Sequence, residues 1–237
     1  MTSAKVFPRI VNAGADALIV YFSDTISEKD NQRVIALKQR LQQSDLALLD
    51  LVPAYSSLMI YYDVLQTDEA TLRRALQPYL AEEKGLPGQS QHQTFTIDVY
   101  YDESVGPDIQ HVMKEKQLNR DQLISLHTQS KFRVYALGFA PGFAYLGSLP
   151  DKLIMPRLRR PRERVPTGSV AIAEQQTAIY PLPSPGGWNI IGRTAKPLYE
   201  PEKGIISALE VGDSVQFRAI SKAEFIDQGG RLEQLDD

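Results

Sequence analysis

The sequence predicts an α+β protein in which a small N-terminal α/β sandwich is followed by a C-terminal β-barrel. Helical and strand-like patterns alternate through the first third, whereas short apolar runs separated by Gly or Pro fill residues 132–218. Between these regions, residues 82–91 carry charges, then Gly and Pro, and no apolar period. We therefore predict domains at residues 1–88 and 92–220, with a charged tail at residues 221–237.

The N-terminal domain is expected to contain a β-hairpin, a helix, two further strands and a second helix. Ser27 precedes an acidic first turn, and apolar residues then recur at helical spacing, so a capped amphipathic helix should run to about Gln43. Asp68 is the expected cap of the second helix. The strand-like runs are residues 9–11, 17–22, 46–52 and 58–62.

The C-terminal domain is expected to open with a half-buried strand at residues 94–100, where apolar and polar residues alternate. A Gly-Pro-Asp turn leads into two short helices, at residues 108–116 and 119–128. The later strand-like runs are residues 133–137, 170–173, 177–180, 189–192 and 214–217. Many short strands with turn residues between them favour a barrel.

Composition and motif content exclude several classes of function. The net charge of −3 gives no excess of positive potential for a nucleic acid, and the absence of cysteine removes disulfides, thiolate nucleophiles and cysteine-ligated metals. The sequence has no phosphate loop, no G-x-S-x-G elbow and no H-E-x-x-H motif, so we expect no metal site. With no run of about 18 apolar residues and no leader pattern, we expect a cytoplasmic protein without membrane contact.

Residues 137–147 form the most unusual segment, because they combine three glycines, a proline and three aromatic residues. Glycine permits positive φ and close approach of the backbone, and aromatic rings supply rigid apolar walls, so this composition is typical of a loop that shapes a pocket. A glycine-rich barrel corner packed by aromatic residues would have the same composition.

Residues 156–166 concentrate five arginines between prolines that stiffen the chain. The planar guanidinium binds carboxylates and phosphates through two parallel hydrogen bonds, so this segment is a candidate anion site. A solvated basic loop or a docking patch is the alternative interpretation.

Two turn-rich segments follow the arginines. Residues 166–169 place two hydroxyls and a glycine at the start of a strand, and residues 183–188 end in Gly-Gly-Trp. Backbone amides exposed at such turns can bind an anion. Trp188, the single tryptophan, is either a pocket wall or a large core residue.

His127 is the best histidine candidate for a general acid or base. It lies at the C-terminal end of a predicted helix, where the helix dipole favours the protonated form. A single histidine is more often structural, but proton transfer needs a group that titrates near neutrality.

Ordered motifs resemble the family of 5-oxoprolinase B subunits, which also includes allophanate hydrolase subunit 1 and a sporulation kinase inhibitor. The resemblance covers nearly the whole chain. The matching segments are residues 126–127, Tyr135, Gly106-Pro107-Asp108, residues 137–147, Pro156-Arg157, Pro161-Arg162, residues 165–170, Gln176-Thr177, residues 179–181, 184–188 and 191–194.

The resemblance implies a cyclophilin-like β-barrel in the C-terminal domain and a role as one subunit of an enzyme complex. The implied partners are the A and C subunits of 5-oxoprolinase, of which the C subunit is homologous to this chain. Together such subunits open 5-oxoproline to L-glutamate with hydrolysis of ATP. A partner in the complex could bind the ATP and its magnesium. The resemblance also implies the site residues: His127 and Arg162 as catalytic candidates, and Gly138, Phe139, Pro141, Gly142, Phe143, Arg157, Gly168, Ser169, Gly186, Gly187 and Trp188 for substrate or nucleotide.

The chain departs from the family pattern at three places, with Leu158 where a second arginine is common, Thr167 where alanine is common, and Ala173-Glu174 where two glycines are common. These departures bear on the identity of the substrate more than on the fold. Two other functions of the family stay open: inhibition of a histidine kinase by a docking barrel, and membership of an allophanate or urea amidolyase-type hydrolase.

Overall fold

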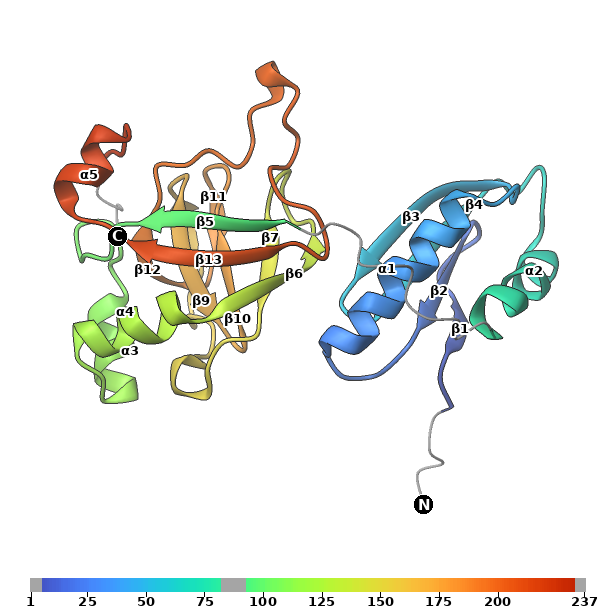
Figure 1. Ribbon diagram of the computed structural model, residues 1–237, viewed down its shortest axis with the longest axis horizontal. Helices are drawn as coiled ribbons and strands as arrows, with labels where there is room; N and C mark the ends of the chain where they lie inside the picture. Colours follow the sequence, from blue (N-terminus) through green and yellow to red (C-terminus); the bar gives the residue numbers. More distant parts are fainter. Residues whose placement is uncertain (1–5, 82–92, 233–237) are drawn as a thin grey trace. The chain divides into compact units, whose positions relative to one another are not determined.

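The chain forms two compact units, Met1–His92 and Gln93–Asp237, in a computed structural model that describes residues 6–81 and 93–232 (Figure 1). The predicted linker at residues 82–91 lies outside the described residues, so its position as a domain boundary stays a prediction. None of the described helices is long and apolar enough to cross a membrane.

The described part of the N-terminal unit has an antiparallel sheet with the strand order β1-β2-β4-β3 and two helices packed on it. Leu18 pairs with Ile60 on one face of the sheet, and both side chains share a core with Leu37 of the first helix. Leu72 of the second helix joins the same core, so both helices cover one face. The elements are β1 (Arg9–Asn12), β2 (Ala17–Tyr21), α1 (Glu28–Gln42), β3 (Leu48–Ala54), β4 (Ser57–Tyr62) and α2 (Glu69–Ala81).

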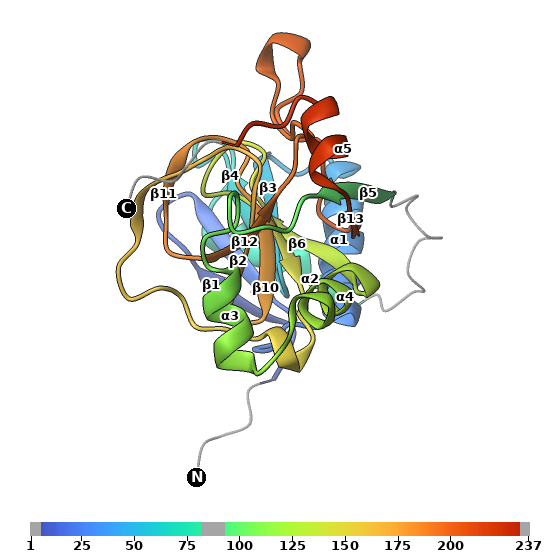
Figure 2. The ribbon, with the colours of Figure 1, turned by 90° about the vertical axis from the view of Figure 1, so that its left-hand side faces the viewer.

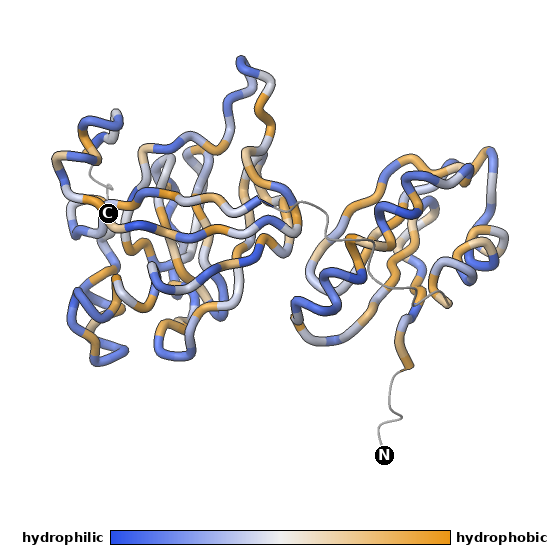
Figure 3. The backbone as a smooth tube through the Cα atoms, in the orientation of Figure 1, coloured by the Kyte–Doolittle hydropathy of each residue, from blue (hydrophilic) through white to orange (hydrophobic). Residues whose placement is uncertain are grey.

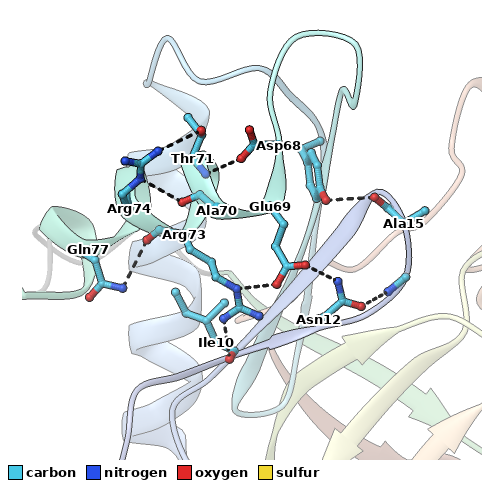
Figure 4. Close-up of polar contacts among 12 residues, drawn as sticks. Ile10, Asn12, Ala15, Asp68, Glu69, Ala70, Thr71, Arg73, Arg74 and Gln77 are labelled. Atoms are coloured by element: carbon cyan, nitrogen blue, oxygen red, sulfur yellow. Dashed lines mark hydrogen bonds and ion pairs between the residues drawn. The ribbon is translucent and has the colours of Figure 1, made fainter.

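Polar side chains fix α2 against β1 (Figure 4). Glu69 accepts hydrogen bonds from Asn12 Nδ2 at 2.8 Å and from Arg73 Nε at 2.7 Å. Arg73 Nη1 also donates to the Ile10 carbonyl at 3.0 Å. Asp68 accepts a backbone N–H of the first helical turn at 2.7 Å, which confirms its predicted role as a cap.

The C-terminal unit is built on a mostly antiparallel sheet with the strand order β6-β7-β10-β9-β12. In addition, β13 pairs antiparallel with β6 and parallel with β5. Tyr100, which follows β5, forms an antiparallel bridge with Arg193 of β12, with reciprocal backbone hydrogen bonds of 2.8 and 2.9 Å. The bridge therefore connects the two ends of this strand series.

The elements of the C-terminal unit are β5 (Thr94–Val99), α3 (Ile109–Lys116), α4 (Arg120–Gln129), β6 (Lys131–Leu137), β7 (Ala144–Gly147), β8 (Arg162–Val165), β9 (Ser169–Ala173), β10 (Gln176–Ile179), β11 (Ser184–Gly186), β12 (Asn189–Arg193), β13 (Ser214–Ala219) and α5 (Lys222–Asp227), with short 3-10 helices at Asp151–Leu153 and Pro201–Lys203. Helices α3 and α4 lie beside each other, and α5 lies apart from them in both ribbon views (Figure 2).

The main sheet of the C-terminal unit buries side chains on both faces. Successive strand residues point to opposite faces, and along β9 Val170 and Ile172 join the large core while Ala171 and Ala173 join a second cluster. Hydrophobic residues recur along the strands of both units, whereas much of α1 is hydrophilic (Figure 3). We call the second group the aromatic cluster; its buried members are Phe143, Val165, Ala171, Ala173, Ala178, Tyr180, Trp188 and Ile190.

The mixed helix and strand content confirms the predicted α+β class. The structure differs from the prediction at β8 and β11, which form a separate two-stranded sheet. The sequence predicts proline-stiffened loops at both segments. The pair stays short since prolines flank it and its register shifts between Ser184 and Gly186. Within the predicted charged tail, α5 buries Phe225 against Tyr100 with ring centroids 5.5 Å apart.

Candidate functional site

The loop between β6 and β7 has the unusual backbone that its composition predicts. Gly138, Phe139 and Gly142 all have positive φ, of 148°, 77° and 78°. A Cβ atom on Gly142 would lie 3.0 Å from the Leu198 carbonyl oxygen, so the loop packs closely as well as turning sharply. Phe139, within this loop, is 64% exposed.

The same loop delivers Phe143 to the aromatic cluster. Its ring contacts Tyr180 and Trp188 edge-on, with centroids 5.4 and 6.0 Å apart, and also Tyr145 at 5.0 Å. Phe139 meets Phe143 edge-on at 5.3 Å. These geometries are the favoured ones for aromatic pairs, so the rings form a rigid wall. The structure therefore brings together Phe139, Phe143 and Trp188, as the sequence predicts.

Hydrogen bonds hold the arginine-rich segment, residues 156–166, beside these aromatic rings. The Leu158 N–H donates to the Gly187 carbonyl at 2.7 Å, and Asn189 Nδ2 donates to the Pro156 carbonyl at 2.9 Å. Pairing of β8 with β11 holds its other end. Three separate contacts thus hold the backbone of the segment, and the Arg157 guanidinium carbon lies 6.0 Å from the Trp188 ring centroid.

The arginines of this segment differ in what they bind. Within residues 6–81 and 93–232, Arg157, Arg159, Arg160 and Arg164 are exposed and form no ion pair. Arg162 is half-buried and forms two parallel hydrogen bonds with Asp108, of 2.8 and 2.9 Å. Its charge is therefore already neutralised, and the four exposed guanidiniums are the groups available to an anion.

Gly168 directly precedes β9, and Ser169 is the first residue of that strand. Gly168 has a φ of 80°, and a Cβ there would lie 2.2 Å from the Thr194 carbonyl oxygen, so only glycine fits. Ser169 is fully buried, and its hydroxyl has no hydrogen-bond partner within the described chain. Since Ile179 pairs with Val170, the next pair places Tyr180 opposite Ser169 on one face.

Tyr180 is a site residue that the sequence reasoning did not single out. Burial raises the pKa of Tyr180 to about 12, while a hydrogen bond from the Trp188 backbone N–H and the charges of Arg157 and Arg162 oppose the rise. The phenol is therefore protonated at neutral pH and can donate a hydrogen bond. A Cβ on Gly186 would lie 2.3 Å from the Tyr180 hydroxyl, whereas one on Gly187 would meet nothing closer than 3.7 Å. A signal was present, since Tyr180 stands within a matching family segment.

His127 lies elsewhere, in the large core of the C-terminal unit. The side chain is fully buried, with Nδ1 2.7 Å from the Tyr101 hydroxyl and Nε2 3.0 Å from Thr177 Oγ1. Burial lowers the pKa of His127 to about 3, so the prediction that the helix terminus would keep it protonated is wrong. Loss of hydration outweighs the helix dipole, and this placement fits a structural role better than proton transfer.

An open hollow of about 270 Å³ lies in the N-terminal unit, between the end of α1 and β3, and is lined by residues such as Lys38, Gln42 and Asp50. Across the described ranges, no group of three or more His, Asp or Glu side chains could hold a metal ion. Among the predicted residues, the structure brings together Phe139, Phe143, Arg157 and Trp188, whereas His127 lies apart from them.

Comparison with known proteins shows the family of this chain. Residues 8–209 match the family described as "Carboxyltransferase domain, subdomain C and D". Over 228 residues the chain is 32% identical to the 5-oxoprolinase B subunit of Bacillus subtilis (strain 168), covering 92% of this chain and 95% of that protein. The chain belongs to the family of 5-oxoprolinase B subunits. The matching residues therefore lie in both units and include all residues of the candidate site.

Solved structures extend the comparison. The crystal structure of TTHA0988 matches with a TM-score of 0.76 and 37% identity, covering 88% of this chain and 40% of that longer chain. The urea carboxylase of Kluyveromyces lactis matches with a TM-score of 0.71 at 16% identity, over 92% of this chain and 22% of that chain. At that identity the second likeness establishes a shared fold alone.

Proposed function

We propose that this chain is the B subunit of an ATP-dependent 5-oxoprolinase, which opens 5-oxoproline to L-glutamate with ATP hydrolysis. The observation that carries the proposal is the likeness of nearly the full length to proteins named as B subunits of 5-oxoprolinase. That designation implies a complex, and we propose the enzyme's A subunit together with its homologous C subunit as the partners. The location proposed for this complex is the cytoplasm.

The candidate site supports an anionic small-molecule substrate. 5-Oxoproline carries a carboxylate and an apolar ring edge, which match the exposed Arg157 and the Phe139 ring, which is 64% exposed and packs edge-on against Phe143. ATP with magnesium would supply the phosphoryl group that activates the poorly electrophilic lactam. The positive charge of Arg157, Arg159 and Arg160, which are all exposed, fits either the substrate carboxylate or a phosphate.

We also propose that the C-terminal unit is a cyclophilin-like β-barrel. The bridge between Tyr100 and Arg193 supports this, because it joins the strand pair β5–β13 to β12. The large core lies on one face of the sheet, and the site lies on the other face, together with the buried aromatic cluster.

The decisive experiment combines the purified chain with the A and C subunits and measures glutamate release and ATP consumption. The arms are 5-oxoproline, allophanate and no substrate. Glutamate formed only from 5-oxoproline, and only in the full complex, is the expected result. If no combination releases glutamate, the proposal fails; turnover of allophanate would favour the amidolyase function, and inhibition of a histidine kinase would favour regulation.

Arg157→Ala tests the site within that complex. Removing an arginine that binds a carboxylate or phosphate should raise the KM for one substrate by roughly tenfold or more, since a charge-assisted hydrogen bond contributes about 1.5–3 kcal/mol. Which KM rises identifies the anion. Arg74→Ala, an exposed arginine on α2, is the matched control and should leave both KM values unchanged. Equal kinetics for the two variants would show that the arginine segment is only a surface feature.

A further inference from the structure

Asp108 has an unusual position for an aspartate at the start of a helix. It is the N-cap residue of α3, yet its carboxylate makes no capping hydrogen bond. Instead the carboxylate accepts from Arg162 Nη1 at 2.9 Å, from Arg162 Nη2 at 2.8 Å and from the Ile190 N–H at 2.7 Å. An aspartate here ordinarily stabilises its own helix, so this carboxylate serves another part of the molecule.

The backbone around Asp108 is also held against β12. The Asp108 N–H donates to the Ile190 carbonyl at 3.0 Å. A Cβ on Gly106 would lie 2.5 Å from the Ile191 carbonyl carbon, so only glycine lets the turn approach this strand. The close approach explains the Gly-Pro-Asp segment of the sequence, and it fixes where the carboxylate can reach.

Asp108 thereby joins three segments that are distant in sequence: its own turn, β8 through Arg162, and β12 through Ile190. The pair is largely removed from solvent, with side-chain exposures of 9% for Asp108 and 23% for Arg162. Arg162 is on β8, directly after the exposed arginines, and Ile190 is two residues beyond Trp188. The two halves of the candidate site are therefore attached to one carboxylate.

We propose that Asp108 is a positioning residue, which acts through Arg162 to hold the arginine segment against Trp188. Only the expected effect of Asp108 on kinetics rests on the proposed function. Asp108 itself touches no substrate. Its carboxylate sets the distance between the Arg157 guanidinium and the aromatic wall, and Arg162 transmits that constraint because two parallel hydrogen bonds fix its plane.

Trp188 makes a direct test possible, since it is the single tryptophan and its emission reports the site alone. In the full-length chain, Asp108→Asn should shift the emission to longer wavelength and increase quenching by acrylamide, at a temperature where circular dichroism shows a folded protein. Asp98→Asn is the matched control, because Asp98 forms an equally bidentate pair with Arg218, at 2.7 and 2.8 Å, on β5 and β13. The control should leave Trp188 unchanged, and identical spectra for both variants would overturn the inference.

Kinetics in the reconstituted complex separate positioning from a purely structural role. Asp108→Asn should lower kcat by about 100-fold, the cost typical of a reacting group displaced by about 1 Å, with a smaller change in KM. Asp98→Asn should retain wild-type kcat. A wild-type complex without activity would refute the proposed function while the fluorescence comparison still decides the positioning role.

Arg162→Lys provides a second route if Asp108→Asn fails to fold. Lysine keeps a positive charge beside Asp108 but cannot make two parallel hydrogen bonds. The variant should therefore change Trp188 emission in the same direction while the chain stays folded. Unchanged emission and unchanged kcat in folded Arg162→Lys would show that the orientation of the pair does not control the site.

Discussion

The imidazole of His127 lies in a chain of hydrogen bonds whose direction can be deduced. Thr177 Oγ1 donates its single proton to the Ala171 carbonyl at 3.0 Å, so it can only accept from His127. The Nε2 atom therefore carries the ring proton, and Nδ1 accepts from the Tyr101 hydroxyl at 2.7 Å. Burial raises the pKa of Tyr101, which keeps that hydroxyl protonated as the arrangement requires.

His127 should remain neutral in the folded protein down to low pH. Its pKa falls from the ordinary 6.5 to about 3 on folding, so between these values the unfolded chain binds a proton that the folded chain does not. Stability is then unaffected by this group above pH 6.5 and decreases as the pH is lowered toward 3, by at most about 1.4 kcal/mol per pH unit. Nitrogen NMR should show the Nε2–H tautomer from about pH 8 to about pH 5.

Histidine variants check the linkage to stability. The free energy of unfolding of His127→Gln should fall less steeply between about pH 6.5 and pH 4.5 than that of the wild type. His111→Gln, which replaces an exposed histidine on α3, is the matched control variant. Titration of the His127 ring with a midpoint near its ordinary value of 6.5 would contradict the buried hydrogen-bonded arrangement.

Two adjacent glycines offer a sharp comparison in the wall of the site. In Gly186→Ala the new methyl group would lie 2.3 Å from the Tyr180 hydroxyl, so the strand or the ring must move. We expect destabilisation by about 1–3 kcal/mol, the usual cost of overpacking, together with altered Trp188 emission. Gly187→Ala places its methyl group 3.7 Å from Pro161 and should be mild. Equal melting temperatures for the two variants would show that Tyr180 is not held as described.

Among the elements, those with a strong local signal were predictable and those made by distant partners were not. Apolar residues at helical spacing after Ser27 predict α1, and the Ser27 hydroxyl does accept from the Asp30 N–H at 3.1 Å. The short strand pair β8–β11 has no such pattern, because its two segments stabilise each other only after the chain has folded.

The candidate site shows the same division. The glycines and aromatic residues of the sequence predict the loop that carries Phe143. Glycine by itself indicates positive φ, and an aromatic ring by itself indicates a rigid apolar contact. His127 bonds to Thr177, 50 positions away, and Arg162 pairs with Asp108, 54 positions away. Neither contact can be deduced from the sequence alone. Predicting the protonation of a group needs its burial, which only the folded structure supplies.

Helix α1 stabilises the hairpin of β3 and β4 through one buried amide. Asn31 Nδ2 donates to the Tyr55 carbonyl at 2.9 Å, and Tyr55 occupies the turn with a φ of 52°. Asn31→Ala should reduce the stability of the N-terminal unit by about 1–3 kcal/mol, because the part-buried Tyr55 carbonyl loses this donor. Hydrogen exchange of β4 amides measures the change. Gln32→Ala, whose amide bonds to Glu28 near the surface, should exchange like the wild type.

At the scale of the whole molecule, charge is distributed unevenly. The chain carries a net charge of −3, yet residues 157–164 hold five arginines and one acid. Since the four exposed arginines lie close together in the sequence, they create a local positive potential despite the overall negative charge. An anionic substrate can therefore be attracted to the aromatic cluster without general affinity for polyanions.

The two units should fold independently, because each has its own buried core. The core of the N-terminal unit comes from residues 18–76, and both clusters of the C-terminal unit come from residues 97–217, with no buried cluster shared between them in the described chain. A fragment of residues 93–237 should therefore unfold cooperatively in urea. Its Trp188 emission should match that of the full chain, because Phe143, Tyr180 and Arg157 all travel with it. Emission typical of an unfolded chain in the isolated fragment would show that the C-terminal core depends on the N-terminal unit.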